Sequence, residues 1–146
     1  MTGKTHYEFL PIYDRHIFYT NNLESLEETV HKYFREGDID LIELLSDGDD
    51  NCHGFAAEIC KRRDPLRVMA FIMFVKDGAS TGTISHEATH VANKIFDYLG
   101  QGADESNDEV MAYLVGHLTD TFMENIRGQK KKNKKLIKGR YKSNIE

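Results

Sequence analysis

The chain has 146 residues, 40% of them hydrophobic, which is long enough for one domain with a core of its own. No stretch approaches the roughly 18 consecutive apolar residues of a membrane span, and the N-terminal residues lack the apolar run of a signal peptide. We therefore expect a cytoplasmic protein with no membrane partner, whose net charge of −5 combines an acidic body with a basic C-terminus.

The first third of the chain predicts strands and one helix. Residues 6–20 place aromatic and β-branched side chains in near alternation, which predicts one or two strands with an edge or a break at Pro11. Apolar residues recur at helical spacing in residues 23–35 and predict a helix. Residues 39–45 are another short apolar segment, and residues 46–51 have the composition of a turn.

The middle of the chain predicts a β-hairpin. Residues 53–60 alternate well enough for a strand, and residues 67–76 form a second one, with a turn at Asp64–Pro65 between them. The second strand is almost entirely apolar from 69 to 75, which indicates that it is buried. If it nevertheless lies at a sheet edge, an extended peptide could pair with it by main-chain hydrogen bonds.

Two helices follow the hairpin. Between Ile84 and Leu99 apolar residues recur at three- and four-residue steps, and Thr83 or Ser85 could cap the first turn. A second helix is predicted from residue 107 to about residue 126. The resulting layout is an α+β domain, with a small, mainly antiparallel sheet packed on two or three helices.

The last 18 residues differ from the rest in charge. Residues 129–146 contain eight of the 19 Lys and Arg and one acidic residue, a net +7, so residues 1–128 carry −12 in a chain of net charge −5. We expect a folded domain over 1–128 and a basic, flexible tail over 129–146. The acidic charge argues against nucleic-acid binding by the folded domain, whereas the tail could contact nucleic acid weakly, bind an acidic partner, or simply be solvated.

The pentapeptide His86-Glu87-Ala88-Thr89-His90 lies within the first of the two helices. Residues four apart share one face of a helix, so His86 and His90 can present two imidazoles to one zinc ion. Glu87 would project beside the metal, where a general base can take a proton from a water molecule that the metal activates. The alternative is that both histidines are ordinary surface residues of an amphipathic helix.

Glu109 is the candidate third ligand. It stands in the first turn of the second helix, with 18 residues between it and His90. Catalytic zinc uses three protein ligands and leaves a fourth position to water. Two imidazoles and a carboxylate suit zinc, although iron and manganese use similar ligands.

The pattern His-Glu-x-x-His followed by Glu-x-x-Ala on a second helix resembles the gluzincin zinc peptidases over about residues 83–118. The spacing before Glu109 is similar to that of the gluzincin aminopeptidases, and Ala112 matches the small residue after their glutamate ligand. Residues 109–117 also resemble a segment of small phage and prophage proteins with the same pentapeptide. The resemblance implies a zincin-like catalytic domain over 1–128. In that domain the zinc ligands would be His86, His90 and Glu109, and the general base would be Glu87.

We therefore expect a zinc metallopeptidase that hydrolyses an amide bond of a peptide or protein substrate. An oxyanion donor is also required, and Tyr113 and His117 on the second helix are candidates, although either could be a packing residue. Asn93 lies close to the face of His86 and could support a ligand, whereas Asp97 is expected to be a surface charge.

Two other functions fit the same residues. One is a zinc hydrolase that acts on another amide, such as a cell-wall or small-molecule substrate. The other is a non-catalytic zinc-binding protein with a structural or regulatory role in a phage or mobile-element assembly, with the basic tail as its docking arm. Glu87 argues against a purely structural site, because zinc binding alone does not need it.

Overall fold

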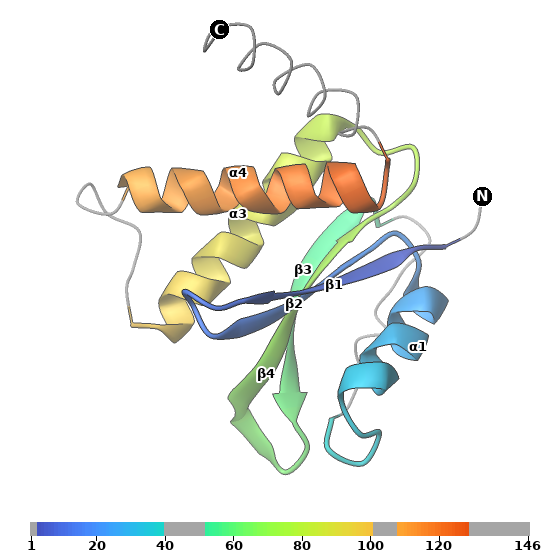
Figure 1. Cartoon of the computed structure of the whole chain (residues 1–146), viewed down its shortest axis with the longest axis vertical. Coiled ribbons are helices and arrows are strands. Elements are labelled where there is room, and N and C mark those ends of the chain that lie inside the picture. The colour runs from blue at the N-terminus through green and yellow to red at the C-terminus, as the bar shows by residue number, and fades with distance from the viewer. Residues whose placement is uncertain (1–2, 40–51, 101–107, 129–146) are drawn as a thin grey trace, which may run out of the picture.

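The computed structural model describes residues 3–39, 52–100 and 108–128. The elements in chain order are β1 (Thr5–Leu10), β2 (Arg15–Thr20), α1 (Leu23–Tyr33), β3 (Gly54–Lys61), β4 (Asp64–Val75), α3 (Thr81–Tyr98) and α4 (Asp108–Asn125). In this part of the chain, a four-stranded sheet separates α1 on one face from the crossing helices α3 and α4 on the other (Figure 1). This arrangement confirms the α+β class.

The sheet has the strand order β1-β2-β4-β3. The pair β3–β4 is an antiparallel hairpin, as predicted; β1–β2 is antiparallel as well, whereas β2 and β4 are parallel. The hairpin of β3 and β4 turns at Arg62–Arg63, because Lys61 already pairs with Asp64 and Arg63 adopts a positive φ of 71°. The predicted turn at Asp64–Pro65 is therefore wrong by two residues.

Strand β4 is central, not an edge. It pairs with β2 along Phe71–Phe74 and with β3 along most of its length, so the hypothesis of a peptide-binding edge at 69–76 is wrong. Both faces of β4 are covered, since Phe71 and Met73 belong to the core under α3 and α4 while Ile72 belongs to the core under α1. A continuous apolar run is the pattern of such a doubly buried strand.

Among the described residues, β3 is an edge strand, since it is the last strand in the sheet order. One isolated bridge, from Ile39 to Lys61, lies at the far end of this strand. From Gly54 to Cys60, β3 has β4 as its only partner strand among the described residues.

The core on the α3 side begins with the amphipathic pattern of that helix. Ile84, Ala88, Val91, Ala92 and Ile95 are fully buried against the sheet and against α4. The helix starts at Thr81 and is capped by Ser80, whose Oγ accepts a hydrogen bond from the Thr83 N–H (3.2 Å). The cap is thus Ser80, and not Thr83 or Ser85 as the sequence indicated.

Removal of this cap should loosen the first turn of α3. We expect Ser80→Ala to lower the free energy of unfolding by about 1 kcal/mol, since one N-terminal N–H loses its partner, while Ser80→Asp should retain it. Urea unfolding of the three proteins followed by circular dichroism measures the difference. Equal midpoints for wild type and Ser80→Ala would show that the cap contributes nothing.

The structure bears on several other predictions from the sequence. Helix α1 ends at Tyr33, two residues earlier than predicted. No helix in the described residues has the length and apolar character needed to cross a bilayer. The apolar segment 39–45 (apart from Ile39), the turn 46–51 and the tail 129–146 lie outside the described residues.

Candidate metal centre

The two histidines of the pentapeptide meet at the surface of α3. The Nε2 atoms of His86 and His90 lie 3.1 Å apart, and both side chains are exposed. Together with a carboxylate oxygen of Glu87, they form a group of three potential ligand atoms within 4.8 Å of one another. This proximity follows from the helix, which places residues four apart one turn above each other.

The donor set fits a single zinc ion. Zinc–imidazole bonds are about 2.0–2.1 Å long, so two imidazole nitrogens on a tetrahedral ion are roughly 3.3 Å apart. The observed 3.1 Å between the Nε2 atoms is close to that separation. The exposure of both rings leaves room for further ligands, as a catalytic site requires.

Glu87 differs from the histidines because it points into the protein. Its side chain is 6% exposed and lies against Gly54, the first residue of β3. A Cβ atom at position 54 would lie 2.9 Å from Glu87 Cγ and 3.1 Å from Glu87 Oε2, so any larger residue there would force a shift. The Lys76 N–H donates to the His53 carbonyl (2.9 Å) and holds the start of β3 beside the loop that enters α3.

Burial has an electrostatic effect on this carboxyl group. Desolvation raises the pKa of Glu87 above its usual value, and the adjacent His86 and His90 partly oppose the rise. A carboxyl group with a raised pKa is better suited to exchange protons near neutral pH than an exposed one.

Glu109, the predicted third ligand, is not part of this three-residue group. It is exposed in the first turn of α4, and that helix begins at the left of the view whereas α3 begins at the upper right (Figure 1). The loop 101–107 between the helices lies outside the described residues. The role of Glu109 as a zinc ligand stays a prediction.

The two candidate oxyanion donors are also outside the group. Tyr113 is 76% exposed, so the alternative of a packing residue finds no support in the described part of the chain. The His117 Nε2 atom lies 2.9–3.0 Å from the two carboxylate oxygens of Glu8 on β1, and Tyr19 donates a hydrogen bond to the same carboxylate (2.7 Å). His117 therefore joins α4 to the sheet.

Sequence reasoning missed Gly54, although a signal was present. A glycine at the start of a strand often marks a site where another group approaches closely, and here that group is the Glu87 side chain. It also missed the contact between α3 and β3 formed by Lys94 Nζ and Glu58 Oε1 (2.8 Å). That pair depends on strand register, which spacing in the chain does not reveal.

Comparisons of the chain with protein families, with curated proteins and with solved structures give no match.

Proposed function

We propose that the protein is a zinc-dependent hydrolase that cleaves an amide bond of a peptide. The observation that supports this most is the pairing of two exposed imidazole nitrogens 3.1 Å apart with a buried carboxylate in the same small group. A structural zinc site would need ligands only, whereas the buried Glu87 has no hydrogen-bond or ion-pair partner among the described residues and suits a general base.

In the proposed reaction, His86 and His90 would hold the metal, with Glu109 as our candidate for the third ligand. Bound zinc would polarise a water molecule and the substrate carbonyl. Glu87 would accept the proton of the attacking water and pass it to the leaving amine nitrogen. The packing contact with Gly54 would keep the Glu87 carboxylate in one position during both proton transfers.

The outer edge of β3 is the proposed location of the peptide. Its first residue contacts Glu87, and β3 runs from there as the edge strand of the sheet. An extended peptide paired with this edge would bring a main-chain carbonyl close to the metal group. This edge replaces the β4 edge that the sequence suggested.

The test is the metal content of each chain. Wild type purified without added metal and then given one equivalent of zinc should retain about one zinc per chain after dialysis, whereas His86→Ala and His90→Ala should retain almost none. His31→Ala, on α1 at the other face of the sheet, is the matched control and should retain zinc as the wild type does. Wild type that stays metal-free would overturn the proposal.

The same experiment tests whether Glu109 is the third zinc ligand. We expect Glu109→Ala to lose most of its zinc, as the histidine variants do. Full zinc retention by Glu109→Ala, together with loss in His86→Ala, would keep the metal centre and assign the third position to another residue or to water.

A further inference from the structure

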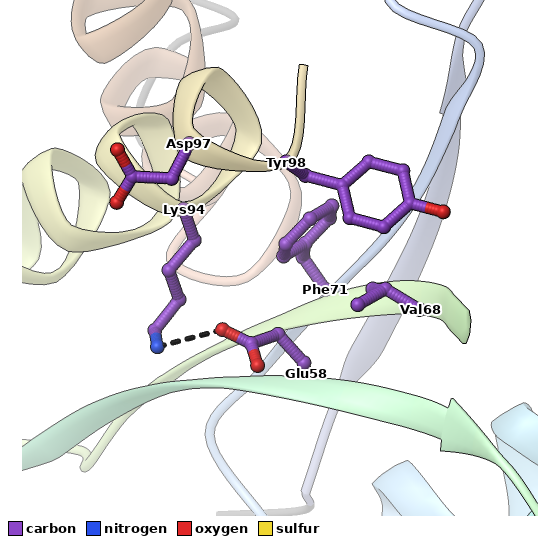
Figure 2. Close-up of a pocket in the computed structure, with 6 residues that line it drawn as sticks. All are labelled: Glu58, Val68, Phe71, Lys94, Asp97 and Tyr98. Atoms are coloured by element: carbon purple, nitrogen blue, oxygen red, sulfur yellow. Dashed lines mark hydrogen bonds and ion pairs between the residues drawn. The ribbon is translucent and has the colours of Figure 1, made fainter. Parts of the chain in front are cut away.

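A pocket of about 300 Å³ opens between the second half of α3 and the strands β3 and β4. Figure 2 shows charged side chains along one side of it and apolar side chains along the other. Its lining residues are Glu58, Lys94 and Asp97 on the charged side and Val68, Phe71 and Tyr98 on the apolar side. The pocket can thus accept a group with an apolar stem and a polar end.

The charged side carries one negative charge in excess. Lys94 Nζ pairs with Glu58 Oε1 at 2.8 Å, and the two side chains are each 35% exposed. The Asp97 side chain is exposed and has no hydrogen-bond or ion-pair partner in the described part of the chain. A positively charged guest would therefore gain Asp97 as a partner, and Glu58 Oε2 as a possible second acceptor.

The apolar side already contacts one cation. The guanidinium carbon of Arg15, which does not line the pocket, lies 4.1 Å from the centre of the Tyr98 ring. The chain thus places a cationic group on this aromatic residue, an attraction that aromatic faces offer to guanidinium and ammonium groups alike. Phe71 lies fully buried behind this side of the pocket, so an aliphatic stem would pack on the partly exposed Val68 and Tyr98.

The pocket lies within reach of the proposed metal centre. Lys94 follows His90 by one helical turn and Glu87 by seven residues, which is about 6 Å and about 10 Å along the axis of α3. Each residue of an extended peptide spans about 3.4 Å. A side chain about three residues from a bond held beside Glu87 would therefore reach the Lys94 end of the pocket.

We propose that this pocket is a specificity subsite that binds an arginine or lysine side chain of the peptide substrate, with Asp97 as the determinant of its charge preference. The subsite rests on the proposed function, since it assigns a substrate to the same cleft. The aliphatic stem of the guest packs on Val68 and Tyr98, and its positive end faces Asp97.

Binding of three blocked pentapeptides to the full-length chain tests the subsite without any need for cleavage. The peptides are identical except for a central arginine, norleucine or glutamate, and their dissociation constants are measured by nuclear magnetic resonance titration of the Glu87→Gln protein, with and without zinc. We expect the arginine peptide to bind about fivefold more tightly than the norleucine peptide, which is the scale of one partly exposed ion pair.

Two further variants identify the residue responsible. Asp97→Asn in the same background should remove the preference for arginine, while the matched control Glu28→Gln, an exposed carboxylate on α1, should keep it. Equal binding of the arginine and norleucine peptides, or an arginine preference that survives Asp97→Asn, would overturn the subsite.

Two outcomes distinguish a peptide subsite from a site for small cations and from the metal centre. Arginine amide alone binding as tightly as the peptide would show a site for small cations and would overturn a peptide subsite. An arginine preference that Asp97→Asn removes, in a chain that retains no zinc, would support the pocket while contradicting the metal centre. The two proposals can therefore fail separately.

Discussion

Replacement of Glu87 by glutamine should abolish hydrolysis and leave zinc binding intact. Glutamine keeps the size of the side chain and can remain against Gly54, but its amide cannot accept the proton of the attacking water. The expected loss of rate is about 100- to 10,000-fold, the range that general acid–base catalysis contributes. Cleavage of fluorescently labelled, unfolded casein by the zinc-loaded proteins gives the rates, and elemental analysis gives the zinc content.

Rate and zinc content together distinguish a base from a ligand and from an unrelated surface charge. Glu28→Gln removes an exposed carboxylate on the other side of the sheet and should cleave as fast as the wild type. Loss of zinc in Glu87→Gln would mean that this carboxylate is a ligand and not a base. An unchanged rate in Glu87→Gln with full zinc content would rule out general base catalysis by this residue.

The helices and their buried faces can be predicted from the sequence, because they depend on the spacing of apolar residues that are close together in the chain. The helical spacing of Leu26 and Val30 predicts the buried face of α1, and both side chains are fully buried. The pentapeptide lies on a helix for the same reason, so the proximity of His86 to His90 could be predicted before any tertiary structure was known.

The sheet topology could not be predicted in the same way. The parallel pairing of β2 with β4 joins Ile17 to Phe71 across more than fifty residues, and no local pattern specifies such a partner. The unbroken apolar run in β4 indicated a buried strand and is typical of a central strand covered on both faces, so only the hypothesis of an edge at this strand was wrong. With β4 central, β3 becomes the edge beside Glu87.

The third ligand shows most clearly what could not be predicted from the sequence. The number of residues between His90 and Glu109 can be counted, but the position of Glu109 depends on how α4 crosses α3. The apolar residues Leu114, Leu118 and Phe122 of α4 are buried in the core shared with α3, whereas Glu109 lies in an exposed first turn. Helix packing fixes that crossing through side-chain fit, which spacing alone does not encode.

The second large effect is expected at Gly54, the residue that holds Glu87 in place. An added Cβ would lie 2.8 Å from the Phe74 carbonyl oxygen and 2.9 Å from Glu87 Cγ. The Phe74 carbonyl belongs to the central strand and cannot yield easily, so the start of β3 must shift, and the Glu87 side chain in contact with it is displaced as well. We expect Gly54→Ala to lower the free energy of unfolding by about 1–3 kcal/mol, the usual penalty for overpacking, and to slow cleavage strongly.

A double-mutant cycle links that loss to Glu87 and separates it from general damage. If Gly54→Ala acts by displacing the base, Gly54→Ala combined with Glu87→Gln should cleave no more slowly than Glu87→Gln alone. Gly37→Ala is the matched control, since a Cβ there meets nothing within 4 Å, and it should leave both stability and rate close to those of the wild type. Additive losses of rate in the double variant would show that Gly54 supports the fold and does not position Glu87 for catalysis.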